Sequence, residues 1–502
     1  PVVARIIRNR EVIGEKNIRI YLGGNLSDLS DPHQMKDMDR LVEILAQKIR
    51  KQVHIRIIGD YDVDGVTSSH LFLTALRRVG AKVDVVIPHR IQDGYGLSLH
   101  LLQQAKEDGV DTILTCDNGI AAIDEIAWAK AQKMTVLVTD HHAVPFEEHE
   151  GRRTEKKSLA DAVVNPHQQD CGYPYKELCG AGVAWNVIRV LYENYDMDKR
   201  EAEDLLDFVA MATVCDVMSL TGENRILVKE GLKRIRHTKN IGLQALMQAC
   251  NVQPENISAY HFGYVLGPCV NATGRLDTAR HALRLFETGQ ETEAEEIARD
   301  LVDLNQERKE LTLQGVEMAK KLCEEGGYEK DPVLVLFLPD VHESIAGLIA
   351  GRIREMYNRP VFVLTRGEEG VKGSGRSTEN YSMYENMCGC AELFTKFGGH
   401  PMAAGLSLPE ENVEKFRRKI NENCPLTVEE VCPDIHIDMA MPVGYASTEL
   451  VHQFALLEPF GKDNPSPLFA DRNLSISRMW LIGKNRNVLR MSVLSEYGQP
   501  VP

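Results

Sequence analysis

Short apolar segments alternate with longer amphipathic segments through the first third of the chain. Five of them have the length of β-strands and cover residues 54–59, 83–88, 112–117, 135–140 and 161–166. Several of the stretches between them, such as SSHLFLTALRRVG and AAIDEIAWAKAQ, have helical periodicity. This alternation predicts an α/β fold with a mostly parallel sheet and helices on both of its faces.

Polar side chains follow each of these strands. In strand order they are Asp60, Asp62 and Asp64; His89 and Arg90; Asp117 and Asn118; Asp140, His141 and His142; and Asn165. Ligands of such sheets bind in the crevice beyond the carboxyl ends of the strands. The sequence therefore predicts one functional site at this edge.

The remainder of the chain predicts further domains, since 502 residues suggest about three. We expect a catalytic domain over 1–285, a long connecting helix over 286–326 and a smaller α/β domain over 327–427. Residues 428–502 have the pattern of a small β-barrel resembling an OB-fold. No obvious final strand precedes Pro502, which favours a barrel that is cut short.

The segment GDYDVDG (59–65) carries three aspartates on alternate positions. An EF-hand loop needs a glutamate at its twelfth position and a helix before it, but here the twelfth residue is Leu71 and a strand precedes. One aspartate would suffice to cap a helix starting near Thr67, so three favour metal ligation.

Crowded carboxylates repel one another unless cations neutralise them. With Asp117, Asp216 and a histidine added, the oxygen and nitrogen donors suit Mn²⁺ or Mg²⁺. Two such ions about 4 Å apart are a usual device for hydrolysing phosphoesters. Taken alone, Asp216 is equally well explained as a structural residue in an apolar run. Neither a P-loop nor a GxSxG motif is present.

Bulk properties limit the class of protein. The net charge of −15 does not exclude a nucleic-acid partner, because a local basic groove can bind phosphates. Eleven scattered cysteines predict reduced thiols in the cytoplasm, and the spacing of Cys388, Cys390, Cys424 and Cys432 disfavours a zinc site. We expect no membrane segment, since no apolar run approaches about 20 residues, and no signal peptide.

Several motifs resemble one family. DYDVDG, TCDNGI, TDHHAVP and ATVCDV are similar, in order and rough spacing, to the motifs of the DHH phosphoesterase superfamily. FGGHPMAAG resembles the signature of its companion DHHA1 domain. VNPHQQDCGYPYKELCGAGVAW, NATGR, GSGRS and LEPFGKDNPSPLF resemble, within that superfamily, the bacterial RecJ family of single-strand-specific exonucleases. The resemblance covers nearly the whole chain.

The resemblance implies roles for the residues at the strand ends. One ion would be held by Asp62 and Asp117, joined by Asp60, and the other by Asp64, Asp117, His141 and Asp216. His142 would lie beside the scissile phosphate as a catalytic residue. Asp140 would orient His141 through its other ring nitrogen, or alternatively cap the end of its strand.

The resemblance also implies contacts to the substrate. The family's clamp on a terminal 5′-phosphate would consist of Arg90, Arg275, Ser374 and Arg376, whose guanidinium groups suit phosphate. His400 would contact the strand or support its own tight turn, and His342 would cap a helix or act in the site. Two departures from the family pattern stand out: Cys269 replaces an arginine and removes a phosphate contact, and Asp463 replaces a glycine in a turn.

The function implied is that of a monomeric, two-metal 5′→3′ exonuclease acting in DNA repair and recombination. It would degrade single-stranded DNA to 5′-mononucleotides, alongside a single-strand-binding protein and a RecQ-type helicase. The main alternative is a DHH phosphodiesterase acting on short oligoribonucleotides or cyclic dinucleotides. A non-catalytic replication scaffold and a manganese pyrophosphatase are disfavoured, the first because every expected ligand position is filled.

Overall fold

The computed structural model describes residues 2–89, 93, 96–149, 152–276, 278–367, 370–427, 430–483, 486–495, 498, 500 and 501. The chain divides into two units, residues 1–302 with 436–502, and residues 303–435. Helix α15 (Glu291–Gly326) begins in the first unit and ends in the second, and it corresponds to the long helix expected from the sequence.

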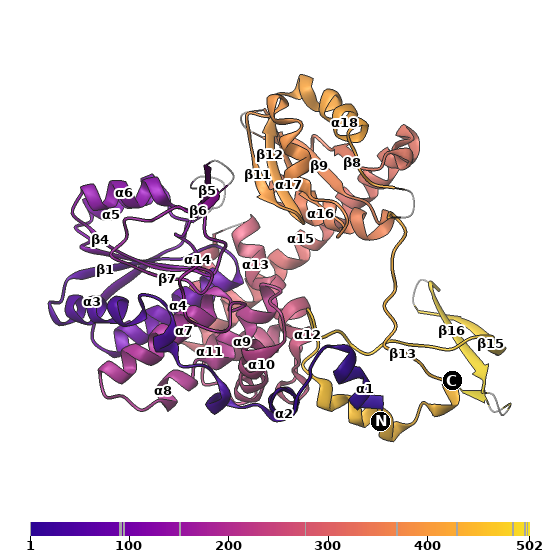
Figure 1. Ribbon diagram of the computed structural model, residues 1–502, viewed down its shortest axis with the longest axis horizontal. Helices are drawn as coiled ribbons and strands as arrows, with labels where there is room; N and C mark the ends of the chain where they lie inside the picture. Colours follow the sequence, from indigo (N-terminus) through magenta and orange to yellow (C-terminus); the bar gives the residue numbers. More distant parts are fainter. Residues whose placement is uncertain are drawn as a thin grey trace. The chain divides into compact units, whose positions relative to one another are not determined.

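A five-stranded parallel sheet forms the centre of the first unit (Figure 1). Its order is β2-β1-β3-β4-β7, with β1 at His54–Ile58, β2 at Lys82–Val86, β3 at Thr112–Cys116, β4 at Thr135–Thr139 and β7 at Ala162–Val164. The chain runs from β1 outward to β2 and then returns to the other side of β1 as β3. This reversal places a topological switch point between β1 and β3, where open α/β sheets bind ligands.

Helices cover both faces of this sheet, as predicted (Figure 1). On one face, Ile57 and Leu114 pack with helices α3 (Met38–Arg50), α4 (Val63–Arg78) and α7 (Gly180–Asn194). On the other, Ile58 and Ile113 pack with α5 (Leu99–Glu107) and α6 (Ile123–Ala131). Side chains alternate along a strand, so each apolar strand supplies both cores and must be apolar throughout.

The rest of residues 1–302 is largely helical. Its remaining elements are α1 (Val2–Asn9), α2 (Glu15–Gly23), η1 (Leu26–Asp28), η2 (Pro32–Gln34), α8 (Arg200–Glu203), α9 (Leu206–Cys215), α10 (Gly222–Ile235), α11 (Ile241–Ala249), η3 (Pro254–Asn256), α12 (Ala259–His261), η4 (Phe262–Leu266), α13 (Gly267–Leu276), α14 (Ala279–Glu287) and the hairpin of β5 (Phe146–His149) and β6 (Arg152–Glu155).

A buried arginine ties two distant parts of the first unit together. The guanidinium of Arg225 on α10 donates hydrogen bonds to the carbonyl oxygens of Tyr21 (2.8 Å), Leu457 (3.0 Å) and Leu456 (3.1 Å). It also lies 4.0 Å from the centre of the Tyr21 ring. Through these hydrogen bonds, Arg225 holds the segment after residue 455 against α2 and α10.

The second unit contains a mixed sheet of order β11-β12-β10-β9-β8. Its strands are β8 (Leu334–Phe337), β9 (Val361–Gly367), β10 (Gly370–Arg376), β11 (Lys396–His400) and β12 (Ala403–Leu408). Only β8 and β9 pair in parallel among the described strands of this sheet. The helical elements are α16 (Glu343–Tyr357), α17 (Met383–Cys388), α18 (Val413–Glu422), η5 (Tyr328–Lys330), η6 (Ala391–Leu393) and η7 (Glu410–Asn412).

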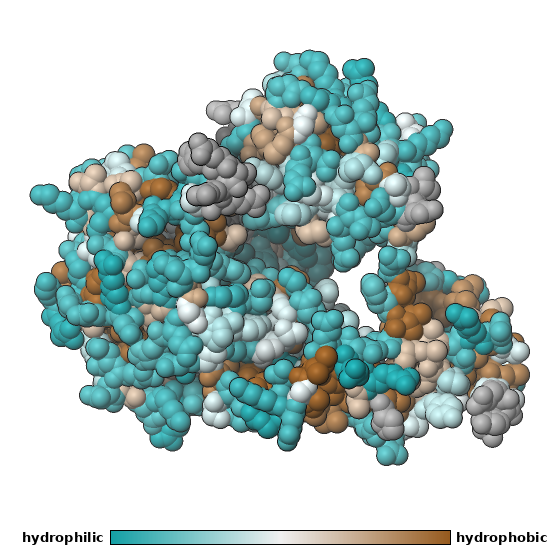
Figure 2. All heavy atoms as spheres, viewed as in Figure 1, coloured by the Kyte–Doolittle hydropathy of each residue, from teal (hydrophilic) through white to brown (hydrophobic). Residues whose placement is uncertain are grey.

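The C-terminal residues form small sheets. Strands β15 (Ser475–Ile482), β16 (Val488–Leu494) and β17 (Pro500–Val501) make one, and β13 (Met439–Ala440) pairs with β14 (Phe469–Ala470). Over the described residues these strands do not close into a ring. Apolar side chains of β15 and β16 are exposed, and brown atoms lie among them in Figure 2. Elements η8 (Val443–Tyr445), α19 (Thr448–Phe454) and η9 (Ala455–Leu457) complete this part.

The described helices give no evidence of a membrane-spanning segment. None of those in the described ranges combines the length with the apolar character that crossing a bilayer requires.

Candidate metal centre

The turn from β1 into α4 presents the first group of carboxylates. Asp62 is the N-cap of α4, and its Oδ1 accepts a hydrogen bond from the backbone N–H of Gly65 at 3.0 Å. The helix therefore begins at Val63, four residues before the start expected from the sequence. Only Asp62 performs this capping, so a cap does not account for Asp60 and Asp64, which are both buried.

Asp64 is held by the N-terminus of a second helix. Its Oδ2 accepts the N–H of Gly180 at 2.6 Å and its Oδ1 the N–H of Ala181 at 2.7 Å, both from the first turn of α7. Helix N-termini stabilise carboxylates through such free N–H groups. The sequence analysis did not predict this contact between Asp64 and a helix N-terminus. The glycine-rich segment CGAG at the start of an apolar helix was the signal that could have indicated it.

Asp117 lies directly beyond β3, across the switch point from the first turn. Its backbone has φ 60°, in the left-handed region, and its N–H donates to the carbonyl oxygen of Thr139 on β4 at 3.1 Å. Asn118 secures the turn by donating to the carbonyl oxygen of Ile58 on β1 at 3.0 Å. The chain thus aims a carboxylate, 2 % exposed, into the space between three strand ends.

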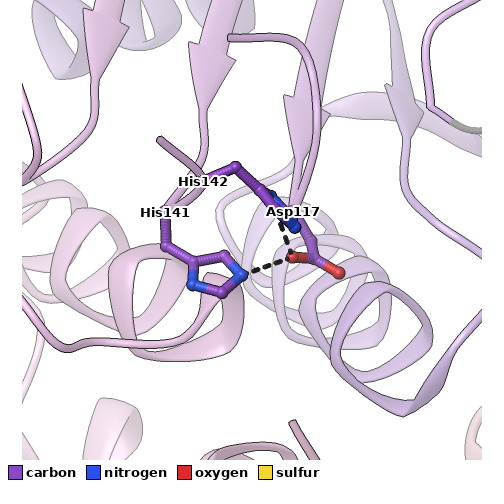
Figure 3. Close-up of side chains that lie close together, drawn as sticks. All are labelled: Asp117, His141 and His142. Carbon is purple, nitrogen blue, oxygen red and sulfur yellow. Dashed lines mark ion pairs between the residues drawn. The ribbon is translucent and has the colours of Figure 1, made fainter. Parts of the chain in front are cut away.

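The two histidines beyond β4 both reach Asp117, as Figure 3 shows. Nε2 of His141 lies 3.1 Å from Oδ1 of Asp117, and Nδ1 of His142 lies 4.0 Å from the same oxygen. His141 is buried and His142 about one-third exposed. Burial lowers the pKa of His141, so its ring is neutral and offers a lone pair to a metal.

Asp140 contacts His142, and the expectation that it orients the His141 ring is wrong. Its Oδ1 lies 2.7 Å from Nδ1 of His142 and also accepts the backbone N–H groups of His141 and His142, while Oδ2 accepts the N–H of Ile120 at 2.9 Å. The alternation of neighbouring side chains turns the ring of His142, not that of His141, toward this carboxylate. Asp140 thus also secures the strand end.

The contact with Asp140 changes the charge of His142. Burial lowers the pKa of His142, but the hydrogen bond and negative charge of Asp140 outweigh it and raise the pKa to about 9. Burial raises the pKa of Asp140, but the hydrogen bond and the positive charge of His142 outweigh it and hold that pKa below its usual value. Near neutral pH this pair therefore presents a protonated imidazolium at the edge of the cluster.

Asp216, which the sequence alone left open, belongs to the cluster. It is the C-cap of α9, and its Oδ2 lies 3.6 Å from Nε2 of His141. The next residue, Val217, has φ 56°, which is rare for a β-branched side chain. Such strain at a helix end is common beside functional groups.

Three groups of side chains have donor atoms close enough to hold a metal ion. Within each group the donors lie within 4.8 Å of one another, and the groups are Asp60, Asp62 and Asp117; Asp64, His141 and Asp216; and Asp117, His141 and His142. In the described parts of the chain, no such group includes a cysteine. Asp117 is shared, so it can bridge two ions.

The electrostatics of the cluster fit divalent cations. Burial raises the pKa of Asp62, Asp117 and Asp216, and the carboxylate of Asp64 raises each of them further. The cluster holds five carboxylates, those of Asp60, Asp62, Asp64, Asp117 and Asp216, which are unstable as anions unless positive charge compensates them. Carboxylate and imidazole donors in this number suit Mn²⁺ or Mg²⁺.

The residues expected to bind phosphate lie in different places. Ser374 and Arg376 share one face of β10 in the second unit, with Arg376 Nη1 3.4 Å from Ser374 Oγ. A Cβ on Gly347 of α16 would lie 2.8 Å from that Oγ, so the glycine leaves room for the pair. Exposed His400 ends β11. His342 caps α16, with its Nδ1 accepting the backbone N–H of Ser344 at 3.3 Å, and a role in the site stays a prediction.

Arg275 belongs to the first unit, at the end of the NATGR segment. Asn271 accepts the N–H of Val63 at 3.1 Å, and a Cβ on Gly274 would lie 2.4 Å from the carbonyl oxygen of Tyr61. NATGR, with Arg275 as its last residue, therefore packs against the DYDVDG turn. Arg90 lies outside the described residues.

The structure describes both positions at which the sequence departs from the family pattern, Cys269 and Asp463. Cys269 is 2 % exposed in the core of the first unit, with its Sγ 3.8 Å from that of Cys250, and the loss of a phosphate contact there stays a prediction. Asp463 adopts φ 59°, the conformation in which glycine is favoured and aspartate tolerated, so the turn keeps its geometry.

We expect Gly180→Ala to weaken Mn²⁺ binding about tenfold to a hundredfold, the usual effect of disturbing groups that orient a ligand. The added Cβ would lie 2.7 Å from Cβ of Asp117 and would displace that carboxylate. Titration calorimetry with Mn²⁺ measures the change. Gly182→Ala is the matched control, because its Cβ would meet neighbours only at 3.4 Å or more. Equal affinities of the two variants would contradict the assignment.

Comparisons with known proteins show which family the chain belongs to. Residues 54–213 match the DHH family N-terminal domain, residues 330–424 the DHHA1 domain and residues 437–501 the RecJ OB domain. A Haemophilus influenzae protein named single-stranded-DNA-specific exonuclease RecJ is 34 % identical, over 99 % of this chain and 88 % of that protein. The chain belongs to the RecJ family.

Other members of the RecJ family differ in length, and two solved structures contain manganese. The Bacillus subtilis RecJ is 33 % identical, and the chain spans 62 % of its length. The crystal structure of RecJ from Thermus thermophilus in complex with Mn²⁺ aligns over 99 % of this chain and 73 % of that one, with a TM-score of 0.77 and 27 % identity. A structure of exonuclease RecJ bound to manganese, 31 % identical, has a TM-score of 0.67 over 79 % of this chain and 96 % of that one.

Proposed function

We propose that the chain is a metal-dependent exonuclease that degrades single-stranded DNA in the 5′→3′ direction to 5′-mononucleotides, in DNA repair and recombination. The observation that carries this is the convergence of His141 and three carboxylates within 3.6 Å of its Nε2. The names of the RecJ relatives, with 5′-end activity expected from the family, and the OB domain support the choice of substrate. Cleavage of short oligoribonucleotides or cyclic dinucleotides has less support.

The proposed ligand sets follow the clusters. Asp60, Asp62 and Asp117 would hold one Mn²⁺ or Mg²⁺ ion, and Asp64, His141 and Asp216 the other, with Asp117 shared. Such a pair of ions supplies Lewis acidity and a water of lowered pKa for phosphodiester hydrolysis. RecJ structures with Mn²⁺ and with Mg²⁺ support this choice of metals.

His142 and Asp140 act beside the metals. The imidazolium of His142 can donate a hydrogen bond to a phosphoryl oxygen of the substrate and oppose the charge that develops there. Asp140 keeps that ring charged and fixes its direction through Nδ1. His142 is thus the proposed catalytic residue and Asp140 its positioning residue.

Contacts to the strand are proposed at the remaining candidates. Arg275, Ser374 and Arg376, with Arg90, would bind the terminal 5′-phosphate, and His400 would contact the strand. Guanidinium groups suit this role because they pair with two phosphate oxygens at once. A clamp at the end of the strand would fix the distance to the cleaved bond, so that each cycle releases one nucleotide.

We expect EDTA to abolish degradation of 5′-phosphorylated single-stranded DNA, and Mn²⁺ or Mg²⁺ to restore it, because the carboxylate cluster has no charge compensation without cations. Digestion of 5′-labelled and 3′-labelled oligonucleotides measures this, since 5′→3′ cleavage releases labelled mononucleotide at once only from the 5′-labelled strand. Duplex DNA and a two-nucleotide RNA are the comparisons. Faster turnover of the two-nucleotide RNA would favour the alternative substrate.

Further features of the whole protein are proposed from the sequence pattern and the family resemblance. They are the domain bounds at 285, 326 and 427, a monomeric state, and a cytoplasmic location, which reduced cysteines favour. A single-strand-binding protein and a RecQ-type helicase are the proposed partners.

A further inference from the structure

Asn165 is a buried polar residue that directly follows strand β7. It is the fifth of the polar residues that stand at the carboxyl ends of the parallel strands. Its side chain is 0 % exposed. Burial of an amide is costly unless its donor and its acceptor both have partners, so the contacts of Asn165 indicate what this residue holds in place.

Both ends of the Asn165 carboxamide are paired. Its Oδ1 accepts the backbone N–H of His167 at 2.8 Å, which closes a turn around Pro166. Its Nδ2 donates to the backbone carbonyl oxygen of His142 at 2.9 Å. The contact with a backbone N–H defines which end of the amide is the oxygen, so the nitrogen faces His142. One side chain thus joins the end of β7 to the segment that carries the two histidines.

A side chain is needed for this link because the hydrogen-bond ladder between β4 and β7 cannot continue. The N–H of Asp140 donates to the carbonyl oxygen of Val164 at 3.1 Å, one step beyond the paired strands. The next donor of a parallel ladder would be the N–H of residue 166, but Pro166 has none. The amide group of Asn165 supplies a donor at this point and directs it to His142.

Asn165 holds His142 from the side opposite to Asp140. Oδ1 of Asp140 lies 3.1 Å from the backbone nitrogen of His142 and 2.7 Å from its ring nitrogen Nδ1. Asn165 holds the carbonyl group of the same residue. The backbone of His142 is therefore fixed at both its N–H and its C=O. Because the ring is joined to this backbone through Cβ alone, a shift of the backbone would move the imidazolium relative to the metal centre.

We propose that Asn165 is a positioning residue for His142 in phosphodiester hydrolysis and acts through the backbone carbonyl group of that histidine. The inference rests on the proposed function. Among the described residues, the side chain of Asn165 makes no hydrogen bond to a proposed metal ligand. A misplacement of about 1 Å can cost about a hundredfold in rate. Loss of the link should therefore lower kcat and leave the binding of metal and DNA nearly unchanged.

Gln168 provides the matched control for truncation of Asn165. It belongs to the same turn, is 8 % exposed, and donates through Nε2 to the carbonyl oxygens of Val163 at 2.9 Å and Asn165 at 3.3 Å. Truncation of Gln168 therefore also removes buried hydrogen bonds from this turn, but none of them is made to His142. Both alanine variants should have lower melting temperatures than wild type.

Asn165→Ala should lower kcat for 5′-phosphorylated single-stranded DNA about tenfold to a hundredfold, with KM and Mn²⁺ affinity within about threefold of wild type. Gln168→Ala should keep kcat within about threefold of wild type. Asn165→Asp keeps the size and the acceptor for His167 but loses the donor, so it should show the same loss of kcat even if the alanine variant does not fold. Equal values of kcat in Asn165→Ala and Gln168→Ala would overturn the proposal.

A double-mutant cycle with His142→Ala separates positioning of the ring from a structural role. If Asn165 acts through His142, adding Asn165→Ala to His142→Ala should change the rate by less than about twofold, since the ring is already gone. The full loss in that background would refute action through His142. Single-turnover rates with enzyme in excess keep the slow variants measurable.

The same cycle on bis(p-nitrophenyl) phosphate with Mn²⁺ distinguishes this inference from the proposed function, because so small a phosphodiester needs no contacts along a DNA strand. We expect Asn165→Ala to lower its hydrolysis by the same factor as that of DNA. If wild type hydrolyses this compound but releases no nucleotide from single-stranded DNA, the proposed function fails and the cycle still tests Asn165. If wild type degrades DNA and the two alanine variants behave alike, only the positioning role fails.

Discussion

Asp117→Asn is expected to lower exonuclease activity by at least about 10³-fold while the chain stays folded. Asp117 is the carboxylate shared between two of the candidate metal groups, and its Oδ1 lies within 4.0 Å of both histidine rings. An amide keeps the size of the side chain but loses the charge that two cations would share. Digestion of a 5′-phosphorylated single strand with Mn²⁺ measures the loss.

The same substitution should separate metal binding from folding. In EDTA the melting temperature of Asp117→Asn should equal or exceed that of wild type, because one of several mutually repelling carboxylates is gone. Mn²⁺ should raise the melting temperature of wild type but not that of the variant, since only a bound ligand stabilises the folded state.

Asp111→Asn is the matched control for this experiment. Asp111 directly precedes β3 as Asp117 directly follows it, and it pairs with Lys48 at 2.5 Å. We expect it to keep full activity and to lose at most about 1 kcal/mol of stability, as partly exposed ion pairs do. If Asp117→Asn retained activity, or if Asp111→Asn lost it equally, the position of the metal centre would be wrong.

Asp140→Asn is expected to reduce activity about a hundredfold and to lower the free energy of unfolding by about 1–3 kcal/mol. The carboxylate accepts from His142 Nδ1 and from three backbone N–H groups, those of Ile120, His141 and His142. An amide can accept at only one of its two terminal atoms, so its NH₂ group faces a buried donor. The His142 ring also loses the negative charge that keeps it protonated.

Metal affinity distinguishes the two roles considered for Asp140. Because its ring contact is with His142, Asp140→Asn should leave the Mn²⁺ affinity within about threefold of wild type while kcat falls. A loss of Mn²⁺ affinity with unchanged kcat would instead support action through His141. Asp161→Asn is the control for stability alone, because Asp161 accepts the N–H of Val136 at 2.8 Å at the opposite end of the sheet.

Much of the fold followed from local patterns. Apolar strands of five residues separated by amphipathic helices admit few arrangements other than a parallel sheet covered on both faces. The carboxyl ends of parallel strands share one edge, so Asp117 and His141 could be placed together although they are 24 positions apart in sequence. The long helix α15 followed from its uninterrupted run of helix-favouring residues.

Contacts between distant segments could not be obtained in this way. The binding of Asp64 by the N-terminus of α7, and the packing of NATGR on the turn at Tyr61, join residues more than 100 positions apart. Asp216 illustrates the difference: in sequence it was an aspartate in an apolar run, and only the direction of α9 brings it to His141.

By itself, the sequence determined which residues stand at the ends of the strands, because the period of two and the parallel order follow from local chemistry. Only the tertiary structure decided which partner each of them has. The segment TDHHAVP shows why. Alternation predicts that the side chains of His141 and His142 point in different directions, but it does not predict which of them turns to Asp140. That choice depends on the backbone N–H groups of Ile120 and of both histidines, which hold the carboxylate beneath His142 and leave His141 facing Asp64, Asp117 and Asp216.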